Sequence, residues 1–111
     1  MKALTHDQLK KMQEKNEKFT LINVLSPDNF KKASIPNSIN IPSDQPDFVR
    51  QVEQAAGGKD RKVIVYCGSF ECPMSHHAAE TLEESGFTEV YAYEGGMKEW
   101  LEKSGESQAA A

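Results

Sequence analysis

The sequence of 111 residues has only two cysteines, Cys67 and Cys72, and no apolar run near the roughly 20 residues that a membrane-spanning helix needs. Two cysteines are too few for a disulfide-stapled secreted scaffold. A chain of this length can bury roughly two-thirds of its unfolded surface without staples. We therefore expect one soluble domain over 1–103, a frayed polar tail over 104–111, and chemistry rather than stapling at the thiols.

An excess of positive charge is also missing. The chain has 13 Lys and Arg against 17 Asp and Glu, a formal net charge of −4. Such a balance provides no field that would attract nucleic acid or anionic lipid, so we expect neither a nucleic-acid nor a membrane partner. The polar first residues lack a signal-peptide pattern, which predicts a cytoplasmic protein.

Strands and helices are predicted to alternate along the chain. Apolar, β-branched runs predict strands over 19–25, 38–41, 62–66 and 88–93. Caps, prolines and glycines predict helices from Thr5 to about 17, over 27–32, from Ser43 or Asp44 to 56, over 73–85 and over 97–103. This order predicts an α/β fold: a central, mostly parallel sheet of about five short strands with helices on both faces.

Four side chains outside the cysteine loop are assigned by spacing. Met12, Trp100 and Leu101 are expected to face the core, whereas His6, in the first turn of a polar helix, is expected at the surface.

Cys67 stands at the end of the strongest predicted strand, where a small-residue loop leads into a helix. Backbone N–H groups of such a loop, together with the helix dipole, favour a thiolate. A thiolate in this setting can attack sulfur, phosphorus or arsenic. We expect Cys67 to be the nucleophile. The substrate-binding loop is expected to consist of Gly68, Ser69, Phe70, Glu71, Cys72, Met74 and Ser75.

The loop holds no arginine, and Glu71 is its one ionised side chain. Phosphoryl chemistry at a cysteine loop needs a fixed bidentate cation for the equatorial oxygens. Soft groups such as Phe70, Met74 and a second sulfur suit a sulfane sulfur better than a phosphate. A phosphatase or arsenate reductase is therefore the less favoured hypothesis.

The chain resembles a single rhodanese domain across about residues 19–101, through the order and spacing of its motifs. These motifs are LINV at 21–24, SP at 26–27, IP at 35–36, INIP at 39–42, VIVYC at 63–67, AA at 78–79 with Leu82, GF at 86–87, VY at 90–91, and EGG at 94–96 with Trp100. The resemblance implies a sulfurtransferase without a cofactor. Its Cys67 would accept a sulfane sulfur from a small donor as a persulfide and pass it to an acceptor thiol, protein or cyanide.

Three departures from that family separate this chain from most members. The usual Asp-Val-Arg stands here as 23–25, Asn-Val-Leu; the His before Ile-Pro is Ser34; and Cys72 and Pro73 lie where an arginine is often found. Loss of one charge-assisted hydrogen bond lowers affinity for an anion roughly ten- to a hundredfold. We therefore expect weak thiosulfate activity and a persulfide or polysulfide as the better donor.

Cys72 has three open roles: it packs under the loop, it forms a disulfide with Cys67 as a resolving thiol, or it receives sulfur from Cys67. A zinc site made of both cysteines with His76 and His77 is not favoured, since adjacent helical side chains point about 100° apart. We expect no metal. Two rival functions remain, a thiol redox switch that uses the two cysteines and a noncatalytic interaction module.

Overall fold

The computed structural model describes residues 2–15, 17–69 and 71–104, and within these ranges the chain forms a five-stranded parallel sheet in the order β1-β5-β4-β2-β3. The strands are β1 (Lys2–Leu4), β2 (Thr20–Asn23), β3 (Ile39–Asn40), β4 (Lys62–Tyr66) and β5 (Glu89–Tyr93). The helices are α1 (His6–Glu14), α2 (Pro27–Lys32), α3 (Phe48–Ala56), α4 (Met74–Glu84) and α5 (Gly96–Ser104). The predicted α/β class, with a parallel sheet, is confirmed.

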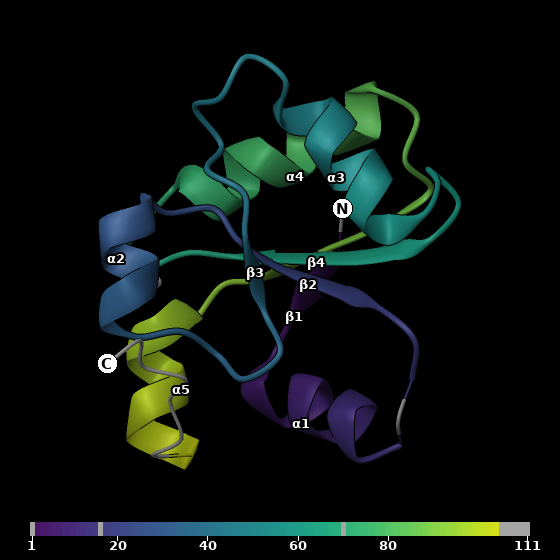
Figure 1. The fold of residues 1–111 in the computed structure, drawn as a ribbon. Coiled ribbons are helices and arrows are strands. Elements are labelled where there is room, and N and C mark those ends of the chain that lie inside the picture. Colours follow the sequence, from purple (N-terminus) through teal and green to yellow (C-terminus); the bar gives the residue numbers. More distant parts are fainter. Residues whose placement is uncertain (1, 16, 70, 105–111) are drawn as a thin grey trace.

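The sheet separates two apolar cores, and each core is closed by a pair of helices. Figure 1 shows α3 and α4 on one face of the sheet and α1 and α5 on the other. Val63 and Val65 point into the core under α3 and α4, whereas Ile64 and Tyr66 point into the core under α1 and α5. This alternation makes β4 the most buried strand, because it is covered on both faces and paired on both edges.

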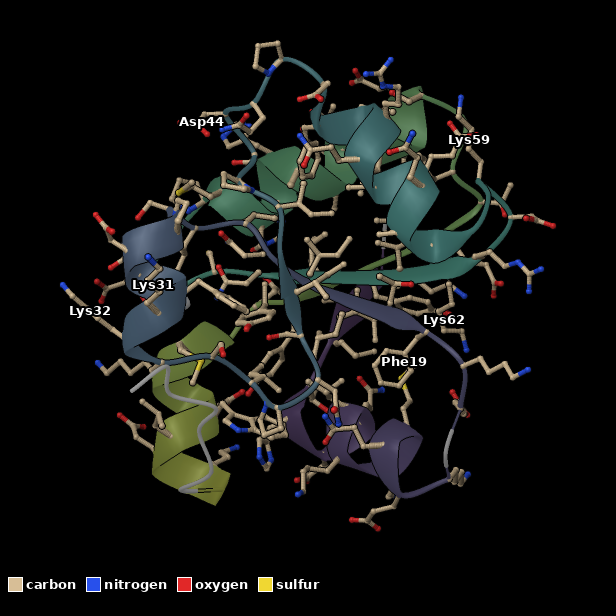
Figure 2. The ribbon with its side chains drawn as sticks, in the orientation of Figure 1. Phe19, Lys31, Lys32, Asp44, Lys59 and Lys62 are labelled. Carbon is tan, nitrogen blue, oxygen red and sulfur yellow. The ribbon has the colours of Figure 1, made fainter. Side chains whose placement is uncertain are left out.

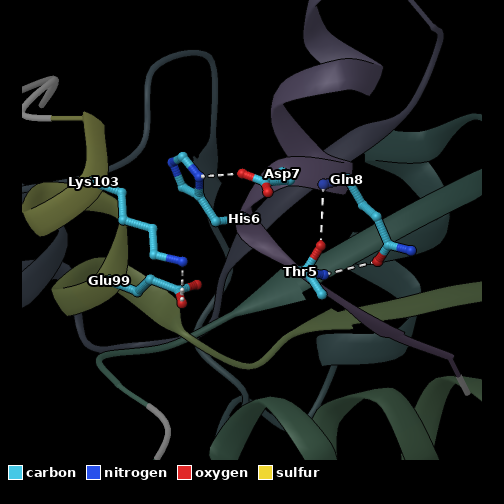
Figure 3. A network of polar contacts seen from close by, with 6 residues as sticks. All are labelled: Thr5, His6, Asp7, Gln8, Glu99 and Lys103. Carbon is cyan, nitrogen blue, oxygen red and sulfur yellow. Dashed lines mark hydrogen bonds and ion pairs between the residues drawn. The ribbon is translucent and has the colours of Figure 1, made fainter.

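Helix α1 begins at the predicted capping box. The Gln8 amide donates to Thr5 Oγ1 at 3.1 Å, and the Thr5 amide donates to Gln8 Oε1 at 2.9 Å (Figure 3). The surface position expected for His6 is wrong, because its ring is buried against Trp100 at 5.4 Å between centroids. The same ring lies 3.6 Å from the Asp7 carboxylate, which is at the surface.

The core position of Trp100 is confirmed, but that of Leu101 is wrong. Trp100 is 1% exposed and Leu101 is 41% exposed. The two residues are adjacent on α5, so their side chains diverge and only one can face the sheet. Met12 is half-buried and packs against the same core as Trp100.

One strand was not predicted from the sequence, and one helix begins later than expected. Strand β1 was not predicted, and it pairs with β5 at the edge of the sheet, with Ala3 opposite Ala92. Helix α3 begins at Phe48 rather than after Ser43 or Asp44, since Pro42 and Pro46 bracket a turn in which the Gln45 amide donates to the Pro42 carbonyl.

Helix α5 is the last described element of the chain. Ser104 is the last residue of α5, and the rest of the expected tail, 105–111, lies outside the described residues.

The lysines labelled in Figure 2 lie at opposite ends of the sheet. Lys31 and Lys32 are on α2, Lys59 precedes β4, and Lys62 is the first residue of β4. In the described part of the chain, no helix is long and apolar enough to cross a membrane.

Tyr66, the last residue of β4, fastens the segment before β3 to the sheet. Its hydroxyl accepts from the Ile35 amide at 3.1 Å and lies 2.8 Å from Ser38 Oγ. Ser38 Oγ donates its own hydrogen to the Ile35 carbonyl at 2.6 Å, so the Tyr66 hydroxyl must donate to Ser38. Burial raises the pKa of this hydroxyl, which keeps the donor protonated.

We predict that Tyr66→Phe lowers the free energy of unfolding by about 1–3 kcal/mol, because it leaves the buried Ile35 amide without its acceptor. Urea denaturation measures this change. Tyr91→Phe is the matched control, since Tyr91 is half-buried and its ring, rather than its hydroxyl, meets the Lys62 ammonium. Equal losses from the two variants would contradict this role of Tyr66.

Candidate active site

Cys67 follows β4 directly and opens the loop that leads to α4. Because β4 lies in the middle of the sheet between β5 and β2, its carboxyl end faces the turns that follow both neighbours. The sequence therefore predicted correctly that this thiol stands where a strand end meets a helix start.

The loop is held from outside by the first turn of α5. The Met97 amide donates to the Cys67 carbonyl at 2.9 Å, and the Lys98 amide donates to the Gly68 carbonyl at 2.8 Å. Gly96 makes this approach feasible, because its φ is +62° and a Cβ there would lie 2.4 Å from the Cys67 carbonyl oxygen. The close packing of this turn therefore fixes the backbone on either side of the thiol.

The Cys67 side chain is fully buried. Its Sγ donates to the Cys72 carbonyl oxygen at 3.4 Å. Burial, and next the neighbouring Cys72 thiol, raise the pKa of Cys67; the hydroxyl and the backbone amide of Ser75 oppose this rise without cancelling it. The structure thus raises the pKa of Cys67, whereas its position at the strand end predicted a stabilised thiolate.

Cys72 is half-buried and has the opposite tendency. Burial alone would raise its pKa, but hydrogen bonds from the Cys67 thiol and from the backbone amides of Met74 and Gly68 together lower it. The backbone amides that were expected to stabilise Cys67 therefore act on both cysteines. The amides of Met74 and Gly68 lower the pKa of Cys72, and the amide of Ser75 acts to lower the pKa of Cys67.

The other predicted loop residues lie around the two sulfurs at different depths. The Cys72 amide donates to the Ser69 carbonyl at 3.1 Å, and the Glu71 amide donates to the Ser69 hydroxyl at 3.3 Å. Glu71 is exposed, Met74 is half-buried against the core that contains Cys67, and Ser75 is buried. Phe70 lies outside the described residues.

The departures at 23–25 have a structural explanation. Asn23 Oδ1 accepts from the Leu25 amide at 2.9 Å, a local turn that a carboxylate could also make. Leu25 packs against the same buried cluster as Cys72 and Met74, so an apolar side chain replaces an arginine beside the sulfurs. Ser34, the third departure, is buried next to the segment that Tyr66 holds.

His76 pairs with a residue that the sequence analysis did not single out. Its Nε2 lies 2.7 Å from Glu94 Oε2, which ties the first turns of α4 to the turn after β5. Only the position of Glu94 directly before Gly95 and Gly96 could have indicated this contact. His77 is exposed, and the described residues contain no cluster of three or more His, Cys, Asp and Glu that could hold a metal.

An open cavity of about 210 Å³ adjoins the loop. Loop residues Ser69 and Glu71 line one side of it. The other side is formed by Gly95, Lys98, Glu99, Glu102 and Lys103. Carboxylates outnumber ammonium groups in this lining, so it supplies no fixed cationic cradle for a small dianion.

The fold and this site define an α/β domain with a cysteine loop at the carboxyl end of its central strand. The Rhodanese-like domain family matches residues 5–103. The uncharacterized protein YqhL of Bacillus subtilis is 33% identical over 100 residues, which cover 90% of this chain and 72% of YqhL. The chain belongs to the rhodanese-like domain family.

Two further relatives show how widely this domain is used. The chain is 30% identical over 98 residues to the HTH-type transcriptional regulator Rv0324 of Mycobacterium tuberculosis, covering 88% of this chain and only 41% of the regulator. The crystal structure of a thiosulfate sulfurtransferase from Pseudomonas aeruginosa matches all of this chain and 21% of its own, with a TM-score of 0.87 and 19% identity. That likeness shows the shared fold.

We predict that Gly96→Ala destabilises the protein more than Gly57→Ala. Both glycines have positive φ, so both substitutions incur backbone strain of about 1–2 kcal/mol. Only at Gly96 does the new Cβ also collide with the Cys67 carbonyl, whereas nothing lies within 4 Å at Gly57. Urea denaturation compares the two variants, and equal losses would show that the turn does not press on the loop.

The two thiols should react with iodoacetamide over different pH ranges. A lowered pKa makes Cys72 a thiolate at lower pH than an ordinary cysteine, and a raised pKa delays Cys67 to higher pH. Cleavage after Glu71 puts the two cysteines on separate peptides for mass spectrometry. In urea, where both are exposed, the difference should vanish; earlier labelling of Cys67 in the folded protein would contradict the assignment.

Proposed function

We propose that the protein transfers a sulfane sulfur from a donor to an acceptor thiol or cyanide, with Cys67 carrying the sulfur as a persulfide. The observation that carries the proposal is the position of Cys67, which is directly after the central strand, with its Sγ 3.4 Å from the Cys72 carbonyl oxygen. Membership of the rhodanese-like family supports the same chemistry.

The transfer would proceed in two covalent steps. First, a sulfur of the protein attacks the outer sulfur of the donor, whose remainder leaves. Then an acceptor thiolate or cyanide attacks the terminal sulfur of the Cys67 persulfide, and Cys67 is restored. Amides directed at the loop sulfurs stabilise negative charge on them in both steps. No cofactor is required.

The surroundings favour a donor of low charge. Leu25 and Met74 are apolar side chains that, like Cys72, pack against the buried cluster containing Cys67, and the exposed Glu71 adds a negative charge to the loop. A low-molecular-weight or protein persulfide, or a polysulfide, therefore fits better than the thiosulfate dianion. The same features disfavour phosphate and arsenate as substrates.

Cys67→Ser tests the proposal directly. The wild-type protein, incubated in turn with thiosulfate, polysulfide and glutathione persulfide, should gain one sulfur atom by intact mass and release it as thiocyanate with cyanide. The variant should retain no sulfur at residue 67 and lose turnover. Failure of every donor to load the wild-type protein would refute the function, and the family fold would then serve a noncatalytic role.

Glu71→Arg should raise thiosulfate turnover roughly tenfold or more, because it exchanges a repulsive carboxylate for a guanidinium that can bind the anion. Glu84→Arg makes the same charge change at the far end of α4 and controls for net charge. Turnover is followed by thiocyanate formation. If the two variants behave alike, the electrostatic account of weak thiosulfate use is wrong.

A further inference from the structure

The two sulfurs lie at different depths, and they are in contact. Cys67 is fully buried, whereas Cys72 is half-buried. The Cys67 Sγ donates to the Cys72 carbonyl oxygen at 3.4 Å, and each thiol shifts the pKa of the other, that of Cys67 upward and that of Cys72 downward. Of the two cysteines, Cys72 is therefore the more accessible to a donor from solvent.

The backbone also treats the sulfurs differently. The backbone amides of Met74 and Gly68 lower the pKa of Cys72, so that sulfur is the better stabilised anion. The Met97 amide donates to the Cys67 carbonyl, and this bond fixes the peptide plane to which the Gly68 N–H belongs. Cys72 thus has two attributes required of a relay sulfur, which must be both an available nucleophile and a good leaving group.

We propose that Cys72 takes the sulfur from the donor and hands it inward to Cys67, where it is held as the persulfide. This inference rests on the function proposed above and assigns a second catalytic residue to it. It differs from the three roles that the sequence left open for Cys72, because sulfur moves from Cys72 to Cys67 and no disulfide forms.

The relay balances without an external reductant. The Cys72 thiolate attacks the outer sulfur of a persulfide donor, R–S–SH; the donor's sulfur–sulfur bond breaks, and R–S⁻ leaves. The Cys67 sulfur then attacks the same outer sulfur, the new bond to Cys72 breaks, and its electron pair restores the Cys72 thiolate. The proton lost from the Cys67 thiol is taken up by R–S⁻, so the products are a Cys67 persulfide and the neutral donor thiol.

Exchange chemistry favours this direction. A thiol of low pKa leaves faster, and a thiol of higher pKa is the stronger nucleophile once it is deprotonated. Cys72 is the former and Cys67 the latter. The sulfur therefore moves from the better leaving group to the more basic sulfur, away from solvent.

The test follows one sulfur atom in time. Wild type, Cys67→Ser, Cys72→Ser and Cys72→Ala are mixed rapidly with glutathione persulfide and quenched with iodoacetamide at increasing delays. Cleavage after Glu71 separates the two cysteines, and mass spectrometry then shows which of them carries the extra sulfur. Separate iodoacetamide rates, without donor, report how open Cys67 is in each protein.

In the wild type, we expect the extra sulfur on Cys72 before Cys67, and in Cys67→Ser we expect it to stop on Cys72. Both Cys72 variants should load Cys67 about tenfold more slowly or worse, since they lack the leaving thiolate. In Cys72→Ala, alkylation of Cys67 should nevertheless become faster, because a covering side chain and a neighbour that raises the Cys67 pKa are removed. Packing alone would speed both reactions.

Three results would overturn the relay: normal loading of Cys67 in the Cys72 variants, absence of sulfur on Cys72 in Cys67→Ser, or a Cys67–Cys72 disulfide with free sulfide in the wild type. The first of these leaves the Cys67 carrier intact. If no protein accepts sulfur on either cysteine, the proposed function itself fails, and the relay fails with it.

Discussion

The two hydrogen bonds from the start of α5 to the carbonyls of Cys67 and Gly68 govern the geometry of the loop. With these carbonyls bound on the outside, the Gly68 amide is available to the sulfurs inside. The contact is so close that only a residue without a side chain fits at position 96. A turn far from Cys67 in sequence therefore orients an amide that lowers the pKa of Cys72.

Much of the frame could be predicted because it rests on strong local patterns. The run 62–66 has the composition of a strand buried on both faces, and Pro73 and Gly86 bracket α4. By contrast, β1 has only three residues and acquires its pairing from β5, so its own sequence contains no strand pattern. His6 is polar by type, and its burial depends on the Trp100 ring, which comes from the other end of the chain.

The position of Cys67 was predicted from the sequence, but the pKa shifts of the two cysteines were not. The position of Cys67 follows from chain order, since a residue after a central strand must lie at the carboxyl edge of the sheet. Which backbone amide stabilises negative charge on which sulfur depends on the orientation of individual peptide planes in the loop. The planes at Cys67 and Gly68 are bound by the start of α5, which is distant in sequence, so the burial of Cys67 and the lowered pKa of Cys72 could not be inferred from sequence.

Both outer strands of the sheet are very short: β1 has three residues and β3 has two, the latter between Pro36 and Pro42. Short borders with neighbouring prolines present few free backbone groups to a strand from another molecule. Lateral recruitment of a second polypeptide by sheet extension is therefore disfavoured. Under the proposed function, a protein that delivers or collects sulfur is therefore expected to approach end-on, through the side chains around the mouth of the loop.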